Sequence, residues 1–218
     1  MRNLRKTFIV GLFCVIMLSA HAMSDISTSS LGLGLSFPYS HQNYNISGMD
    51  SIVLSGFGIN LNWRTMPEHM MLGFFLDTDV FFPSSKTVNI DENYMTTTQF
   101  SDYDYFFGID VLGGFYTVVY QAGSLSIPFG LGLHLDGYSS KLDYKDYEIK
   151  ESVYTLGIGA WLNLEVNISK RFGIYAGTKF IYDFYYQLNE NNSSYKVNKT
   201  GRCTGFTFVP VVGAIWHF

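Results

Sequence analysis

Residues 124–138 read "SLSIPFGLGLHLDGY", and every second position in this stretch is large and apolar. The residues between the apolar positions are small or polar. Alternation with a period of two predicts a β-strand with two unlike faces. In a water-soluble protein the apolar row faces a core, whereas in a membrane protein it faces lipid. The direction of this row therefore decides the class of protein. The row consists of Leu125, Ile127, Phe129, Leu131, Leu133 and Leu135.

The same alternation recurs eight times along the chain. It predicts strands over 29–39, 51–64, 70–82, 101–117, 124–138, 151–167, 172–186 and 203–218. Three connections are short, at 65–69, 118–123 and 168–171, and four are long and polar, at 40–50, 83–100, 139–150 and 187–202. Because short and long connections alternate, they fall on opposite ends of an up-and-down meander.

The N-terminus has the pattern of a secretory signal peptide. A basic start is followed by an apolar run over 7–18, and Ala20 and Ala22 then form a cleavage motif before Met23. A transmembrane anchor is the alternative, but spanning helices need about 20 apolar residues. We therefore expect residues 1–22 to be a signal peptide and residues 23–218 to form one barrel domain.

Charge and cysteine content argue against a nucleic-acid-binding protein and against a disulfide-bonded fold. The chain has 14 basic and 18 acidic residues, and removal of Arg2, Arg5 and Lys6 with the signal peptide leaves 11 against 18, a net charge near −7. A nucleic-acid partner is not expected at that charge. Cys203 is the one cysteine of the expected mature chain, so no intramolecular disulfide is expected. Aromatic residues make up 17% of the chain and charged residues 15%.

Sorting the strand residues by parity gives two opposite faces. The apolar face carries no charged residue. The other face carries most of the glycines and a set of charged residues: Asp77, Asp79, Asp102, Asp104, Asp110, Asp136, Glu165, Lys179 and Asp183.

An eight-stranded barrel has an interior just wide enough for its own side chains. The large residues of the apolar face would overfill it, while an apolar exterior without charge suits hydrocarbon. The aromatic residues gather at both ends of the apolar face, as in the interfacial girdles of membrane barrels. The sequence therefore predicts an all-β fold, an eight-stranded antiparallel up-and-down transmembrane β-barrel. The two aromatic bands are Tyr103, Tyr105, Tyr154, Tyr182, Phe184 and Tyr186 at one end, and Trp63, Phe115, Phe172, Trp216 and Phe218 at the other.

Two stretches resemble a known family. The last strand, "GFTFVPVVGAIWHF", resembles the C-terminal signal of outer-membrane proteins, with Trp216 and Phe218 at its end. "IPFGLGL" at 127–133 resembles a strand of the small opacity, OmpA, OmpX and OmpW types of barrel. The resemblance implies a bacterial outer-membrane location, assembly by the barrel-assembly machinery, contact with outer-membrane lipid, long loops outside the cell and short turns in the periplasm. The periplasmic domain of the OmpA arrangement is not expected.

The inward face carries the candidates for chemistry. His134 lies two residues from Asp136, which is expected to face Asp104 or Phe106 across the 118–123 turn. Such a set is capable of acid–base work, but no nucleophile motif accompanies it, so a buried polar cluster is favoured and no enzyme is predicted. The acidic residues expected near the long-loop end, namely Asp77, Asp79, Asp102, Asp104 and Asp136, have oxygens that suit a hard cation. No metal or cofactor is predicted, because no ligand spacing matches a known loop.

Two functions remain open. The inward row mixes polar groups with bulky apolar side chains, and the resemblance to OmpW-type barrels implies a narrow conduit for small hydrophobic solutes. The alternative is a structural or surface-interaction barrel whose four long loops bind host surface molecules. The two differ in one observable: if Phe75, Phe106 and Trp161 close the lumen, the conduit is disfavoured. The inward apolar residues are Ile52, Leu54, Met71, Phe75, Phe106, Leu112, Trp161, Ile181, Val209, Val211 and Ile215.

Overall fold

The computed structural model describes residues 26–46, 49–67, 70–91, 94–144, 147–192 and 196–218. The predicted signal peptide, with its cleavage residues Ala20, Ala22 and Met23, lies outside these ranges and stays a prediction. No helix in the described ranges is long and apolar enough to cross a membrane. The elements are β1 (Ile26–Ser36), β2 (Tyr39–Ile46), β3 (Met49–Pro67), β4 (Gly73–Asp91), β5 (Tyr94–Gln99), the short 3-10 helix η2 (Phe100–Asp102), β6 (Tyr103–Ala122), β7 (Leu125–Tyr144), β8 (Tyr147–Asn167), β9 (Phe172–Asn192) and β10 (Lys196–His217).

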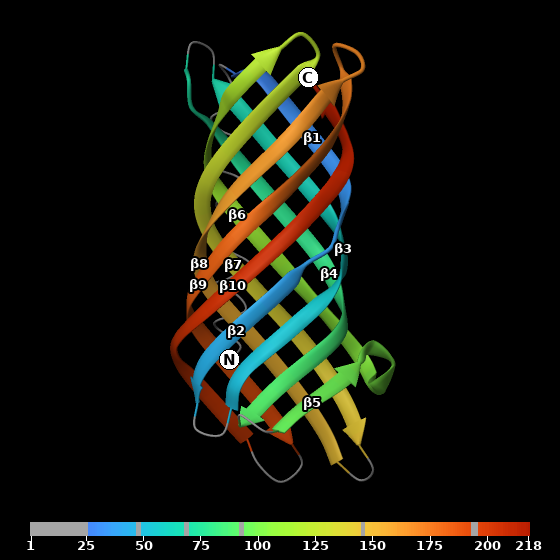
Figure 1. Cartoon of the computed structure of the whole chain (residues 1–218), viewed down its shortest axis with the longest axis vertical. Coiled ribbons are helices and arrows are strands. Elements are labelled where there is room, and N and C mark those ends of the chain that lie inside the picture. Colours follow the sequence, from blue (N-terminus) through green and yellow to red (C-terminus); the bar gives the residue numbers. More distant parts are fainter. Residues whose placement is uncertain (1–25, 47–48, 68–69, 92–93, 145–146, 193–195) are drawn as a thin grey trace.

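The strands form a closed antiparallel ring (Figure 1). β1 and β2 are two halves of one strand, and each half pairs with β3 on one side and β10 on the other. From β3 the ring continues through β4, β6, β7, β8 and β9 back to β10. β5 pairs only with β4 and is not a member of the ring. The predicted eight-stranded barrel is confirmed.

The first strand breaks at Phe37 and Pro38, because proline has no N–H to donate to a neighbouring strand. The register nevertheless continues across the break, since Ser36 lies opposite Gly58 and Tyr39 lies opposite Ser55. Single hydrogen bonds bridge the gap: the Phe37 amide donates to the Pro210 carbonyl (3.0 Å), and the Gly56 amide donates to the Pro38 carbonyl (3.1 Å).

The strands run further than the sequence predicts. The connections β3–β4, β6–β7 and β8–β9 are short and lie with the C-terminus at one end of the barrel, at the top of Figure 1, which we call the turn end. At the opposite, extended end, most of the predicted long loops are strand. The prediction of long loops was wrong because it relied on apolar alternation, whereas backbone pairing continues after the outward residues become polar.

Bulges change the face that some residues occupy. Asp104 is an extra residue of β6 between the pairs Tyr103–Leu142 and Tyr105–Lys141. Asp104 is therefore exposed, and the Tyr103 ring turns inward to contact Phe106. The predicted outward position of Tyr103 and inward position of Asp104 were wrong, because a bulge shifts the parity.

Three further predicted positions were also wrong. Phe184 is an extra residue of β9 relative to β8, so Tyr186 is buried inside. Asp102 lies in η2 and is exposed. Met71 lies before β4 begins at the turn end and is 87% exposed.

The outer surface of the ring is apolar. In the stretch 124–138, Leu131 and Leu133 of the apolar row are 57% and 65% exposed, while His134 of the other row is fully buried. We call the outward apolar surface of the ring the apolar belt. Around the rest of the barrel it includes Phe57, Ile59, Phe115, Ile158, Phe180, Phe206, Val212 and Trp216. So wide an exposed apolar surface marks a membrane interaction. The leucine row of 125–135 thus faces lipid, as predicted.

Glycines let β6 and β7 lie close together inside the ring. A Cβ on Gly132 would overlap the Gly113 carbonyl oxygen and lie 3.1 Å from the Gly114 Cα, whereas a Cβ on Gly113 would meet the Leu76 Cδ1 atom first, at 3.3 Å. Backbone atoms cannot move aside as a leucine tip can, so glycine is sterically required at position 132 but not at position 113.

We predict that Gly132→Ala lowers the free energy of unfolding by about 1–3 kcal/mol, since it forces the strands apart. The matched control Gly113→Ala is expected to change it by less than about 1 kcal/mol, because only a flexible side chain must give way. Urea titration of the refolded barrels, followed by tryptophan fluorescence, measures both. Equal effects of the two variants would contradict the assigned packing.

Candidate functional site

Three neighbouring strands bring three carboxylates side by side within the barrel. Asp79 on β4 lies opposite Asp110 on β6, which in turn lies opposite Asp136 on β7. The predicted neighbours of Asp136, Asp104 or Phe106, were wrong because β6 continues to Ala122 and its turn lies beyond the predicted one. Like charges directly opposite each other destabilise a sheet, so this row requires compensation from the other strands.

Lys179 on β9 supplies a positive charge from across the lumen. Its ammonium group is fully buried and forms ion pairs with Asp79 and Asp110, and with Asp77 at 3.0 Å. A buried charge is tolerated only when it is paired and hydrogen-bonded. Lys179 therefore holds carboxylates of β4 and β6 together.

His134 links the acidic row to β9. Its Nδ1 lies 2.7 Å from Asp183 Oδ1, and its Nε2 lies 2.8 Å from Asp110 Oδ2. Gln42 on β2 donates an amide hydrogen bond to Asp183 Oδ2 (2.7 Å). The predicted inward position of His134 agrees with the structure. Both ring nitrogens are engaged and the ring is fully buried, so the structure offers no acid–base contact to an external substrate.

Side-chain amides bind both carboxylate oxygens of Asp77. Asn60 donates to Asp77 (2.7 Å), Asn62 donates to the other oxygen of Asp77 (2.9 Å), and the Tyr175 hydroxyl donates to Asn60 (3.0 Å). We call the connected set of Asp77, Asp79, Asp110, Asp183, His134 and Lys179 the central network. It draws on β4, β6, β7 and β9 and so cross-links the wall through the lumen.

Toward the turn end a second layer fills the lumen. Phe75 and Trp161 stack with ring centroids 5.1 Å apart, and both side chains are almost fully buried. Arg64 donates to Glu165 from its two terminal guanidinium nitrogens, and its guanidinium carbon lies 5.9 Å from the centre of the Trp161 ring. This bidentate ion pair lies against the aromatic stack.

Toward the extended end a third layer closes the lumen. Phe106 contacts Tyr138 at 5.6 Å between ring centroids, and both are almost fully buried. Further toward the extended end, Lys86 donates a hydrogen bond to Glu151 (2.5 Å). Glu151 also accepts a hydrogen bond from the Tyr138 hydroxyl (2.5 Å). Phe75, Phe106 and Trp161 thus all lie in the lumen, as predicted, and they help to fill it.

Sequence reasoning missed three of these charged residues. Arg64 and Glu151 stand at the ends of predicted strands, and their parity alone would have placed them on the inward face. Lys86 lies in a segment that was interpreted as a loop, so no parity was assigned to it.

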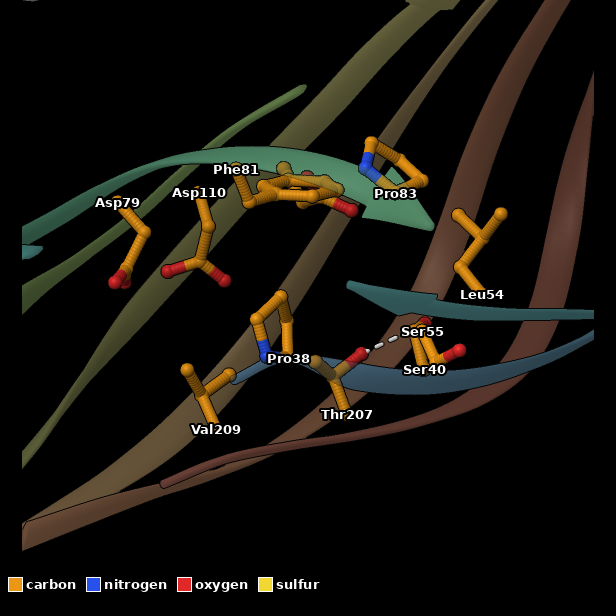
Figure 2. A pocket seen from close by; sticks show the side chains of 11 residues that line it. Pro38, Ser40, Leu54, Ser55, Asp79, Phe81, Pro83, Asp110, Thr207 and Val209 are labelled. Atoms are coloured by element: carbon orange, nitrogen blue, oxygen red, sulfur yellow. Dashed lines mark hydrogen bonds between the residues drawn. The ribbon is translucent and has the colours of Figure 1, made fainter. Parts of the chain in front are cut away.

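A small cavity of about 20 Å³ lies between the central network and the third layer, lined by residues such as Pro38, Pro83, Asp79 and Asp110 (Figure 2). That volume holds about one water molecule. Asp136 also lines it, with its buried Oδ1 atom lacking a hydrogen-bond partner. Within the described ranges, no group of His, Cys, Asp or Glu has the arrangement of a metal site.

Comparison with solved structures identifies the fold. The outer membrane protein OprG from Pseudomonas aeruginosa matches with a TM-score of 0.56 and 10% identity, over 89% of this chain and 97% of that chain. The outer membrane protein AlkL, solved in lipid bilayers, matches with a TM-score of 0.53 and 11% identity, over 89% of this chain and 91% of that chain. Neisserial surface protein A matches with a TM-score of 0.50 and 13% identity, over 86% of this chain and 97% of that chain. No protein family model and no curated protein sequence matches.

The closed ring, the apolar belt and these structural matches define one class of protein. The chain has the fold of the small eight-stranded β-barrels of the bacterial outer membrane. In this class the short turns face the periplasm and the longer connections lie outside the cell. From this rule we infer that the turn end faces the periplasm and the extended end faces the outside of the cell.

We predict that Lys179→Met destabilises the barrel by about 3–5 kcal/mol, because it leaves buried carboxylates without their cation. Lys150→Met is the control: Lys150 pairs with Glu148 on the exposed surface, and such pairs contribute about 0–1 kcal/mol. Urea titration in lipid vesicles measures both variants. Adding Asp79→Asn and Asp110→Asn to Lys179→Met should recover part of the loss, and no recovery would contradict the electrostatic assignment.

Proposed function

We propose that the protein is a surface-interaction barrel, which presents the extracellular ends of its strands to molecules of a host surface. The observation that carries this proposal is the filled lumen. Three layers of buried side chains follow one another along the barrel, and the cavity beside the central network has a volume of about 20 Å³. With the interior filled, the extracellular surface is the part of the molecule available for binding.

The extracellular part is also well ordered for recognition. The hairpins β7–β8 and β9–β10 remain paired beyond the apolar belt, up to Tyr144–Tyr147 and Lys196–Asn191. Outside the ring, β5 offers one unpaired edge, along which Met95, Thr96 and Thr97 are exposed. Exposed strand edges are templates for pairing with an extended peptide. Paired strands lose less conformational entropy on binding than flexible loops do.

A narrow conduit for small hydrophobic solutes is the second candidate. One observation favours it: the cavity lies beside two irregularities of the wall, the break at Pro38 and the shift of register between Ser55 and Gly56 on β3. A solute crossing there would have to displace the central network or the aromatic layers, so we rank the conduit below surface interaction.

Cutting back the four extracellular hairpins to the level of the belt should abolish adhesion of expressing bacteria to cultured host cells. Insertion should persist, because the belt and the periplasmic turns are unchanged. The measurements are adhesion counts and heat-modifiable gel mobility of the same membranes. The predicted assembly signal at Trp216 and Phe218 is retained in both versions. Full adhesion by the shortened barrel would overturn the proposal.

Uptake of a small hydrophobic solute into liposomes tests the second candidate. We expect the intact protein to give no uptake above protein-free liposomes, because the three layers block the lumen. Phe75→Ala with Trp161→Ala opens only one layer and should also remain closed. Uptake by the intact protein would reverse the ranking of the two candidates.

A further inference from the structure

The cations of the extracellular end differ in how they are paired. Lys86 and Lys141 each bind a carboxylate at 2.5 Å, and Lys150 pairs with Glu148. Three cations at the beginning of β10 are exposed and form no ion pair or side-chain hydrogen bond with the residues that the structure describes: Lys196, Lys199 and Arg202. Among the described cations of the extracellular end, the lack of an ion pair is confined to β10. General solubility does not explain why these cations gather on one strand.

Arg202 points outward, toward the lipid side of the wall. Its neighbour Cys203 is buried inside the barrel, and its partner on β9 is Tyr185, which is 42% exposed. The next outward residues of β10 toward the periplasm are Thr204 and then Phe206, which is 64% exposed and begins the apolar belt. Four residues of strand span about 13 Å, and the tilt of about 40° shortens this to about 10 Å along the membrane normal. Arg202 thus lies at the level of the outer-leaflet headgroups.

The surroundings of Arg202 also suit an anion. Across β10, Thr204 lies opposite Asn43, and Phe206 lies opposite His41, both exposed on β2. In the described residues of β1, β2, β9 and β10 the outward row contains no acidic side chain. On the opposite side of the ring, by contrast, Lys141 is surrounded by Asp104, Asp143 and Glu148. The barrel therefore has one side that favours negative charge at the membrane surface.

We propose that this β10 patch, formed by Arg202, His41, Asn43 and Tyr185, binds a phosphate group on an outer-leaflet glycolipid. Guanidinium is the side chain best matched to phosphate, because it donates two parallel hydrogen bonds. The acyl chains of the same lipid would lie against Phe206 and Phe208, which follow Arg202 on the outward row of β10 toward the periplasm. The headgroup thus meets the cation while its chains meet the belt, a combination that no water-soluble anion satisfies.

Lys199 provides a matched control within the same strand. It lies opposite Leu188, a buried residue, so it belongs to the inward row at the mouth of the barrel. A soluble polyanion that approaches from outside the cell would meet Lys199 as readily as Arg202, whereas a membrane lipid reaches only the outward row. Arg202→Gln and Lys199→Gln remove the same charge from opposite faces.

The experiment measures retention of diphosphorylated lipid A by the refolded barrel in detergent micelles, using native mass spectrometry. We expect Arg202→Gln to weaken binding roughly 5-fold, which is the usual contribution of one cation near an anionic membrane. Lys199→Gln and the periplasmic variant Arg171→Gln should bind as the intact protein does. Heat-modifiable mobility confirms that each variant is folded.

Four results would overturn the proposal. Equal retention by Arg202→Gln and the intact protein would remove Arg202 from the site. Equal binding of dephosphorylated lipid A would show that the belt alone holds the lipid. An equal loss in Lys199→Gln, or displacement of the lipid by inorganic phosphate at lipid-like concentrations, would point to a free anion as the ligand.

Discussion

Hydrocarbon offers no partner to a backbone N–H or C=O group, and every other feature of this barrel follows from that constraint. The ring closes when β10 pairs with both halves of the first strand, β1 and β2. Closure divides the side chains into an outward and an inward set. Because the outward set must be apolar, the polar residues of these strands are confined to a lumen with little space.

The central network is the consequence of that confinement. Asp79, Asp110 and Asp136 lie side by side because the register of β4, β6 and β7 aligns them. Lys179 and His134 connect the first two of these carboxylates to β9. Buried ion pairs contribute little stability compared with apolar packing, but the removal of one partner is costly. The network therefore favours one register of the ring over its alternatives.

A filled interior moves the search for function to the outside of the barrel. The side chains of Trp161, Phe75 and Phe106 are buried in the lumen. The strands, however, continue beyond the belt and carry polar side chains on a paired backbone. The unpaired cations of β10 lie on this extension, where headgroups and extracellular molecules are both within reach. The proposed lipid contact and the proposed surface contact thus share one part of the barrel.

The sequence by itself determined the strand count, the lipid-facing direction of the leucine row at 125–135, and the inward position of His134. These follow from a period of two, which is a local property of the chain. Only the tertiary structure decided which residues meet: Asp110 opposite Asp136, Lys179 beside Asp79, and Arg64 on Glu165. Register depends on bulges at residues such as Asp104 and Phe184 and on where each turn begins, and alternation does not encode either of these. The extracellular extensions were missed for a related reason, since hydrogen bonds between backbones continue strands whose side chains no longer alternate between apolar and polar.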